Sequence, residues 1–390
     1  MSLAYDVLPV TLVTGFLGSG KSTLLSDMLQ GEAARDTAVL VNEFGEVGLD
    51  HLLIGAIDTQ TILLDNGCVC CSIRGELKDA LASLFSRRAR GEVPPFGRVV
   101  IETTGLATPA PILATVLADP LVRCHFRLDA TVAVVDAVNA QAQRKHHPEW
   151  LAQVTAADQI VISKTDLVDD ADAARVGETL SSVNPAAIQW VRCGRSRLRA
   201  WQDQEDREGQ PLLDALLRPS NPIEVISRAG HVVAGWLTPG KSVFDAAQAQ
   251  AQDVHGADSG ADETAPRRSP LMHRVDVPAS AANIHAFTIE IDAPLDWSIF
   301  TLWFTLLLNR HGDKILRVKG LLSVAGSERP AVIHAVQHLV HPVLHLDAWP
   351  DTLPATQRRS QLVFITEGLE RDAVEASYRR CAAHLENDAH

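Results

Sequence analysis

Residues 15–22 read GFLGSGKS and match the phosphate-binding pattern G-x-x-x-x-G-K-[ST] in full. An apolar run, Val10–Thr14, precedes them and a helical pattern, Thr23–Gln30, follows, which is the context that such a loop requires. We expect Lys21 to reach the β- and γ-phosphates of a nucleotide and the Ser22 hydroxyl to bind Mg²⁺. The predicted nucleotide contacts in this loop are Gly15, Gly18, Ser19, Gly20, Lys21, Ser22 and Thr23.

A second apolar run, Arg98–Ile101, ends in an acid and is followed by Thr-Thr-Gly. A carboxylate at Glu102 can hold the hydration shell of Mg²⁺, and Gly105 lets its amide approach the γ-phosphate. The usual acid at this place is Asp, so Glu102 is a departure. A strand-end acid is by itself often a solvated helix cap, but beside the phosphate loop we predict that Glu102 acts with Lys21 and Ser22 in catalysis.

Residues 163–166 read SKTD and follow the expected strand Gln159–Ile162. They resemble the guanine-reading motif N-K-x-D with Ser in the Asn position. Asp166 can accept hydrogen bonds from N1 and the exocyclic amine of guanine, and the aliphatic stem of Lys164 can lie over the base. We therefore predict GTP rather than ATP, the alternative being a solvated turn at a strand end.

Three of the six cysteines lie within residues 66–71, which read NGCVCC. Thiolates are soft ligands that suit Zn²⁺ and Cu⁺, so Cys68, Cys70 and Cys71 predict a transition-metal site. The alternatives are a buried cluster of small apolar side chains, a redox pair and coincidence. A disulfide between adjacent cysteines is strained, which disfavours the redox pair.

An acidic segment, residues 42–50 (NEFGEVGLD), follows the second expected strand, where P-loop GTPases place their first switch. Glu46 or Glu43 could add an oxygen ligand to the thiolates and complete a tetrahedral site. If so, the metal and the γ-phosphate would share one segment, and nucleotide hydrolysis would change the metal affinity.

Composition and charge restrict the partners of this chain. A net charge of −13 without a long Lys/Arg cluster predicts no nucleic-acid partner, because phosphate backbones would be repelled. The N-terminus does not read as a signal peptide, and the most apolar stretch, Ile299–Leu308, is too short to span a bilayer. We expect a cytoplasmic protein without a membrane partner, and the oligomeric state stays open.

The length of 390 residues favours two domains. Short apolar runs alternate with helical patterns over the first two hundred residues, which predicts a mostly parallel α/β sheet. The expected strands are Pro9–Thr14, Ala38–Val41, Arg98–Ile101, Thr131–Val135 and Gln159–Ile162, and the expected helices are Ser22–Gln30, Leu77–Arg88 and Pro109–Leu117.

The segment 241–270 is poor in large apolar residues and is predicted to be a flexible part of a linker at 226–280. It divides a P-loop GTPase domain, 1–225, from a smaller α+β domain, 281–390. The elements expected in the second domain are strands at His285–Ile291, Lys314–Val318, Leu321–Val324, Val332–Leu339 and Gln361–Ile365, and helices at Leu295–Arg310 and Leu369–Leu385.

The motifs GFLGSGKST, NEFGEVGLD, GCVCC, ETTGLATP and SKTD occur in this order, and together they resemble the CobW-like family of metal-handling GTPases. Residues 314–320 and 359–365 look like the C-terminal domain of that family. The resemblance implies a slow GTPase whose nucleotide state sets the affinity for a metal and for a client metalloprotein. It carries metal ligands to Cys68, Cys70 and Cys71, and to Glu46. Zinc fits the thiolates best, with cobalt, nickel or iron as alternatives.

The histidines depart from the dense His tract of many zinc-associated relatives. His231, His255 and His273 are scattered, and we interpret them as solvated linker residues. His334, His338, His341 and His345 are closer together, and either form a second metal site or are ordinary sheet-edge histidines. A helix would bring His334, His338 and His341 to one face, whereas a strand would group His334 with His338 and His341 with His345.

Two other functions stay open from the sequence. One is a non-catalytic metal buffer or sensor in which the nucleotide is structural. The other is a small-molecule kinase, since phosphate loops serve both classes, although the SKTD motif disfavours it.

Overall fold

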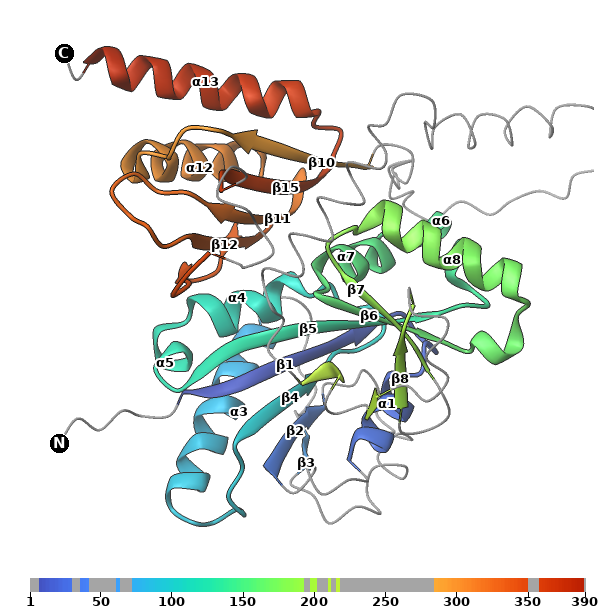
Figure 1. Cartoon of the computed structure of the whole chain (residues 1–390). Helices are drawn as coiled ribbons and strands as arrows, with labels where there is room; N and C mark the ends of the chain where they lie inside the picture. Colours follow the sequence, from blue (N-terminus) through green and yellow to red (C-terminus); the bar gives the residue numbers. More distant parts are fainter. Residues whose placement is uncertain are drawn as a thin grey trace, which may run out of the picture.

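The computed structural model describes residues 7–29, 36–41, 61–63, 72–192, 197–201, 210–211, 215–217, 284–349 and 358–388. Within these residues the chain forms two sheets, which Figure 1 shows one above the other with helices between them. The predicted linker, 226–280, lies outside the described residues. No helix in the described part is long and apolar enough to cross a bilayer.

The larger sheet has nine described strands in the order β3-β2-β4-β1-β5-β6-β7-β8-β9. All neighbouring strands from β3 to β7 in this order are parallel, whereas β8 and β9 at one edge are antiparallel to their neighbours. This confirms the predicted α/β fold with a mostly parallel sheet. The strands are β1 (Leu8–Gly15), β2 (Thr37–Val41), β3 (Thr61–Leu63), β4 (Arg98–Glu102), β5 (Phe126–Asp136), β6 (Gln159–Ser163), β7 (Ile188–Arg192), β8 (Arg197–Ala200) and β9 (Gln210–Pro211).

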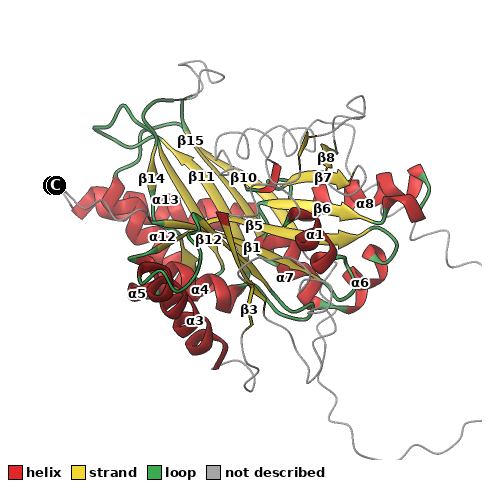
Figure 2. Cartoon of the chain, turned by 90° about the horizontal axis from the view of Figure 1, so that it is seen from below, coloured by secondary structure: helices red, strands yellow, loops and turns green. Residues whose placement is uncertain are grey.

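Helices cover both faces of this sheet, because alternate residues of each strand are apolar on both sides (Figure 2). In β6, for example, Ile160 and Ile162 pack with α7 and α8, whereas Val161 belongs to the cluster that includes α1. The described helices of this domain are α1 (Lys21–Met28), α3 (Ser72–Ala89), α4 (Ala110–Ala118), α5 (Pro120–Arg123), α6 (Ala140–His146), α7 (Pro148–Ala156), the 3-10 turn η2 (Thr165–Leu167) and α8 (Asp170–Val183).

The smaller sheet is antiparallel, in the order β10-β15-β11-β12-β13, with β14 also paired to β12. Two helices cover its outer face through an aromatic core that includes Phe300, Trp303 and Phe364. This is the predicted α+β domain. Its elements are β10 (Ile284–Ile291), α12 (Trp297–His311), β11 (Ile315–Leu322), β12 (Ala331–Val336), β13 (Leu339–Val340), β14 (Leu344–His345), β15 (Ser360–Glu367) and α13 (Arg371–Asp388).

Three expected strands of the smaller domain differ from the observed ones. The expected strands Lys314–Val318 and Leu321–Val324 are one continuous strand, β11. Gly320 lies inside this strand and pairs with Ile333 and Leu362 on the neighbouring strands. A Cβ there would lie 2.8 Å from the Leu362 side chain and 2.9 Å from that of Ile333, so glycine lets these two side chains pack over it. The expected strand Val332–Leu339 is instead broken after Val336, where Gln337 has a φ of 52° and turns the chain back.

The two sheets are joined through a buried ion cluster. Asp158, just before β6, forms ion pairs with Arg317 and Lys319 of β11, at 2.8 Å for Lys319. All three residues are at most 5% exposed. Arg317 also donates to the carbonyl oxygens of Thr155 and Ala156 at the end of α7, and the other Asp158 oxygen accepts from the Thr131 amide at 2.9 Å. The smaller domain is therefore bound by charges that have been removed from water.

Burial by itself would raise the pKa of the Asp158 carboxyl, but the charges of Lys319 and Arg317 outweigh it and hold the pKa below its ordinary value. A carboxyl whose pKa is lowered by folding stabilises the fold above its unfolded pKa of about 4. That contribution is lost as the pH falls toward the folded pKa.

We predict that Asp158→Asn lowers the free energy of unfolding by about 3 kcal/mol at neutral pH, because it leaves two buried cations without their anion. Urea unfolding measures the free energy of unfolding of both proteins, and the difference between the two values should become smaller as the pH falls below about 4. The matched control is Asp292→Asn, since Asp292 is 87% exposed in its ion pair with Arg359. Equal stability of the two variants would contradict the interpretation of the buried cluster.

Candidate nucleotide and metal site

The loop between β1 and α1 has the backbone of a phosphate cradle. Gly15, Gly18 and Gly20 all have positive φ values, of 143°, 71° and 95°. Lys21, 8% exposed, extends back over the loop, and its Nζ donates to the carbonyl oxygens of Gly15 at 2.9 Å and Phe16 at 3.2 Å. An ammonium group thus lies within the curve of the loop.

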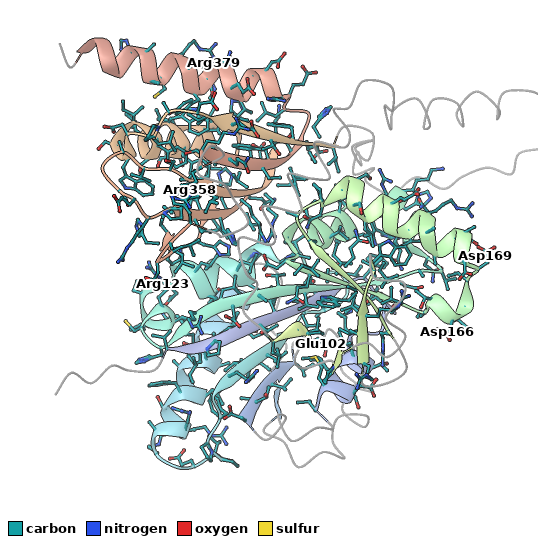
Figure 3. All side chains as sticks on the ribbon, in the orientation of Figure 1. Glu102, Arg123, Asp166, Asp169, Arg358 and Arg379 are labelled. Carbon is teal, nitrogen blue, oxygen red and sulfur yellow. The ribbon has the colours of Figure 1, made fainter. Side chains whose placement is uncertain are left out.

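Glu102 lies beside this loop because β4 is the parallel neighbour of β1, with Val13 opposite Glu102. The Ser22 hydroxyl donates to Glu102 Oε1 at 3.0 Å, and Glu102 is 4% exposed at the end of its strand (Figure 3). A hydroxyl and a carboxylate oxygen are hard ligands, which suit Mg²⁺. The two predicted Mg²⁺ ligands, 80 residues apart in the chain, are therefore adjacent.

The segment after β4 lies against the phosphate loop. A Cβ on Gly105 would lie 2.6 Å from the Leu17 amide nitrogen, so only glycine permits this approach. Gln153, 1% exposed on α7, holds the segment by donating from Nε2 to the carbonyl oxygens of Gly105 at 3.1 Å and Ala107 at 3.0 Å. The geometry brings Gly105 to the loop, and Gln153 is a supporting residue that no sequence signal singled out.

The Ser163 hydroxyl joins the SKTD turn to the phosphate loop. Its Oγ lies 2.7 Å from the Ser19 carbonyl oxygen and 3.2 Å from that of Val135, and Ser163 is 4% exposed. The serine at the Asn position of the motif therefore ties the turn to the backbone of the phosphate loop.

Lys164 and Asp166 project from the end of β6. Lys164 has a φ of 57°, and its Nζ bonds Asp136 Oδ2 at 2.7 Å. Asp166 lies in the following turn, where its side chain is exposed (Figure 3). The stem of Lys164 is thereby fixed, while the Asp166 carboxylate is accessible to a nucleobase.

Asp136, at the end of β5, is a site residue that the sequence analysis missed. It is 1% exposed and also accepts from the Val138 amide and from Asn139 Nδ2, both at 2.8 Å. Burial would raise the pKa of its carboxyl, but the hydrogen bonds of Lys164, Asn139 and Val138 hold the pKa below its ordinary value. The signal was available, because Asp136 ends the apolar run Thr131–Val135 just as Glu102 ends its own.

The predicted transition-metal ligands Cys68, Cys70, Cys71 and Glu46 lie outside the described residues, as does Glu43. The described strands fix where their segments begin. The chain leaves β2 at Val41 and β3 at Leu63, which are paired in register, and Val41 is also opposite Glu102. Both segments thus start at the edge of the sheet that carries Glu102.

The C-terminal histidines are arranged in neither of the expected groupings. The turn at Gln337 folds β13 back on β12, so that the His341 amide donates to the His334 carbonyl at 2.9 Å and the two rings lie 5.5 Å apart. Among the described residues no group of three or more His, Cys, Asp or Glu side chains could hold a metal ion. The second metal site is therefore not supported at these histidines.

Residues 9–190 match the family model described as the CobW/HypB/UreG nucleotide-binding domain, and residues 284–382 match the cobalamin synthesis protein cobW C-terminal domain. Among curated proteins, the chain is 30% identical over 370 residues to zinc chaperone YjiA of Escherichia coli, covering 95% of this chain and 97% of that protein. It is 34% identical over 222 residues to zinc chaperone CobW of Pseudomonas aeruginosa, covering 49% of this chain and 58% of that protein.

Among solved structures, a Zn(II)-bound triple mutant of YjiA GTPase superposes with a TM-score of 0.60 at 25% identity. The superposition covers 96% of this chain and 99% of the other, so it includes both sheets. The sequence motifs, the two domain matches and the full-length similarity agree. The chain belongs to the CobW family of P-loop GTPases.

Proposed function

We propose that this protein binds and slowly hydrolyses GTP at the carboxyl edge of the larger sheet, and that the nucleotide state controls its affinity for zinc. The zinc would bind at Cys68, Cys70 and Cys71, with Glu46 as a further ligand, and pass to a client metalloprotein. The observation that carries the proposal is the meeting of Lys21, Ser22 and Glu102 with the Ser163–Asp166 turn around one loop.

The phosphates would be held by the loop amides and by the Lys21 ammonium, which lies within the curve of the loop. Ser22 and Glu102 would hold Mg²⁺, directly and through its water shell. Bound Mg²⁺ neutralises charge on the β- and γ-oxygens. Gly105 would bring its amide to the γ-phosphate, since its backbone lies against Leu17.

The base would be read by Asp166, with the stem of Lys164 over one face. The bond from Lys164 to Asp136 supports this role, because it keeps the lysine extended before any base arrives. Preorganisation of this kind lowers the entropy that binding must offset. Asp136 is then a positioning residue that acts on the nucleotide through Lys164.

The link to zinc rests on where two segments start. The predicted switch segment, 42–50, begins after β2 and the NGCVCC segment follows β3, and both strands end beside Glu102. The relatives that are named zinc chaperones support zinc as the cargo. Binding free energies are linked. If a nucleotide changes the affinity for zinc by some factor, zinc must change the affinity for that nucleotide by the same factor.

Glu102→Gln is predicted to lower kcat for GTP hydrolysis about a hundredfold, since the amide keeps the size of the side chain but loses the charge that holds Mg²⁺. Phosphate release under saturating GTP measures it, with Glu178→Gln, exposed on α8, as the control. Full activity of Glu102→Gln would contradict the assignment. Absence of phosphate release from the wild type with every metal tried would favour the non-catalytic metal buffer.

Asp136→Asn is predicted to weaken GDP binding about tenfold, a loss of about 1.4 kcal/mol, because Lys164 loses its anchor. Preference for GDP over IDP should stay near its wild-type value, since Asp166 reads the exocyclic amine. Titration of fluorescent analogues measures both quantities, and Asp313→Asn on the exposed surface is the control. Wild-type affinity in Asp136→Asn would show that the ion pair does not position the lysine.

Competitive zinc titration is predicted to give affinities that differ about 5- to 150-fold between a GTP analogue and GDP. Cys71→Ser should lose most of the affinity in both states, and Glu46→Ala should weaken binding and remove the difference between the states. The control is Cys124→Ser, because Cys124 is a free, exposed cysteine that is distant from the motif in the sequence. Equal zinc affinity with GTP analogue, GDP and no nucleotide would contradict the coupling.

A further inference from the structure

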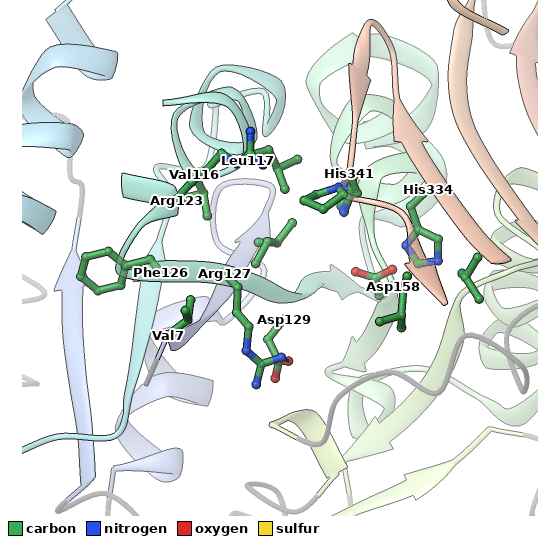
Figure 4. A pocket seen from close by; sticks show the side chains of 14 residues that line it. Val7, Val116, Leu117, Arg123, Phe126, Arg127, Asp129, Asp158, His334 and His341 are labelled. Carbon is green, nitrogen blue, oxygen red and sulfur yellow. Dashed lines mark hydrogen bonds and ion pairs between the residues drawn. The ribbon is translucent and has the colours of Figure 1, made fainter. Parts of the chain in front are cut away.

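A cavity of about 360 Å³ lies between the two domains, at the amino edge of the larger sheet. One side is formed by α4, α5 and the start of β5, and the other by Asp158 and the β12–β14 region of the smaller domain (Figure 4). The nucleotide site is at the opposite, carboxyl edge of the same strands. The volume is within the range of about 300–1,000 Å³ that small-molecule sites occupy.

The walls of this interdomain cavity are largely apolar. Val116 and Leu117 at the end of α4 and Phe126 at the start of β5 line one side, while Val332 and Leu344 line the other. Phe126 and Val332 are 2% and 4% exposed, so their positions are fixed by packing, whereas Leu344 is 53% exposed. The apolar chain of a ligand could therefore pack against buried side chains inside the cavity and enter past the exposed Leu344.

Of the described residues, two cations and two carboxylates line the cavity, and the excess of positive charge comes from residues behind the lining. Arg127 pairs with the lining carboxylate Asp129 at 3.4 Å, and Arg123 is the other lining cation. The second carboxylate, Asp158, is bonded to Arg317, Lys319 and the Thr131 amide, so that two cations are paired with this one anion. In a chain of net charge −13, a site that is locally positive is suited to an anion.

Two imidazoles complete the polar end of the cavity. The Nε2 atoms of His334 and His341 are buried and have no hydrogen-bond partner among the described residues. Burial lowers the pKa of both rings, to about 4 for His341, so both are neutral at neutral pH. A buried polar atom without a partner costs about 1–3 kcal/mol, which a ligand that hydrogen-bonds it would recover.

We propose that the interdomain cavity binds a small organic anion, a carboxylate carried on a short apolar chain. The carboxylate would lie near His334, His341 and Arg123, and the chain would follow the apolar walls. A metal cation fits poorly, because Asp158 is saturated and Arg317 and Lys319 repel it. Since each domain supplies one wall, the bound anion would hold the two domains in their docked arrangement.

Isothermal titration of the full chain with octanoate tests the proposal. Octanoate should bind saturably to one site, whereas octan-1-ol, which has the chain without the charge, and inorganic phosphate, which has charge without the chain, should bind at least tenfold more weakly. Equal binding of octanoate and octan-1-ol, or no octanoate binding at millimolar concentration, would overturn the proposal.

Two variants locate the site without disturbing the core. Arg123→Gln, on the exposed rim, should weaken octanoate binding about tenfold, while Lys145→Gln on α6 leaves it unchanged. Leu344→Trp should block the cavity and abolish binding while the thermal midpoint stays near that of the wild type. Unchanged octanoate binding in both Arg123→Gln and Leu344→Trp would contradict the assignment. So would a His341→Gln variant that binds one zinc ion fewer than the wild type.

Discussion

The parallel pairing of β2, β4, β1, β5 and β6 makes these strands end at one edge of the larger sheet, and the nucleotide site depends on this constraint. Strand pairing fixes Val13 opposite Glu102 and Asp136 opposite Ser163. Groups that are far apart in the chain, such as the Ser163 hydroxyl and the Ser19 carbonyl oxygen, are thereby held within hydrogen-bond distance of one another. Ligands of open α/β sheets bind beyond the carboxyl ends of their strands for this reason.

The opposite edge of the same sheet carries the contact with the smaller domain. Asp158 immediately precedes β6, whose five residues lead directly to the Ser163–Asp166 turn. A buried charge at one end of the strand and the Ser163–Asp166 turn at the other are thus joined by a single hydrogen-bonded segment. Helices α4 and α7 lie between the two sheets and contact both, and α8 contacts β10 of the smaller sheet (Figure 1). The docking of the smaller domain and the position of the Ser163–Asp166 turn both depend on β6.

Much of the larger domain could be predicted because its strands and its phosphate loop are marked by residues that are close together in the sequence. Apolar runs marked β1, β4 and β6, and the glycine spacing marked the loop at 15–22, since buried parallel strands need continuous apolar residues. The domain boundaries at 225 and 281 stay predictions.

What the sequence did not reveal depends on distant contacts. Asp158 meets Arg317 and Lys319 only because two sheets pack together, and no spacing in the chain announces that meeting. His334 faces His341 because Gln337 adopts positive φ, which neither a helical nor a strand periodicity contains. Asp136 is different, because the sequence shows it directly after the apolar run Thr131–Val135, and it could have been predicted as a strand-end acid.

Serine at position 163 has a consequence for how firmly the Ser163–Asp166 turn is tied to the phosphate loop. A hydroxyl carries one hydrogen, yet two carbonyl oxygens, those of Ser19 and Val135, lie within reach of it. Rotation about the Cβ–Oγ bond moves that hydrogen from the Ser19 carbonyl to the Val135 carbonyl, whereas an asparagine amide has two hydrogens and could serve two acceptors together. The hydrogen bond that ties this turn to the phosphate loop can therefore be exchanged for one to the sheet without any movement of the backbone.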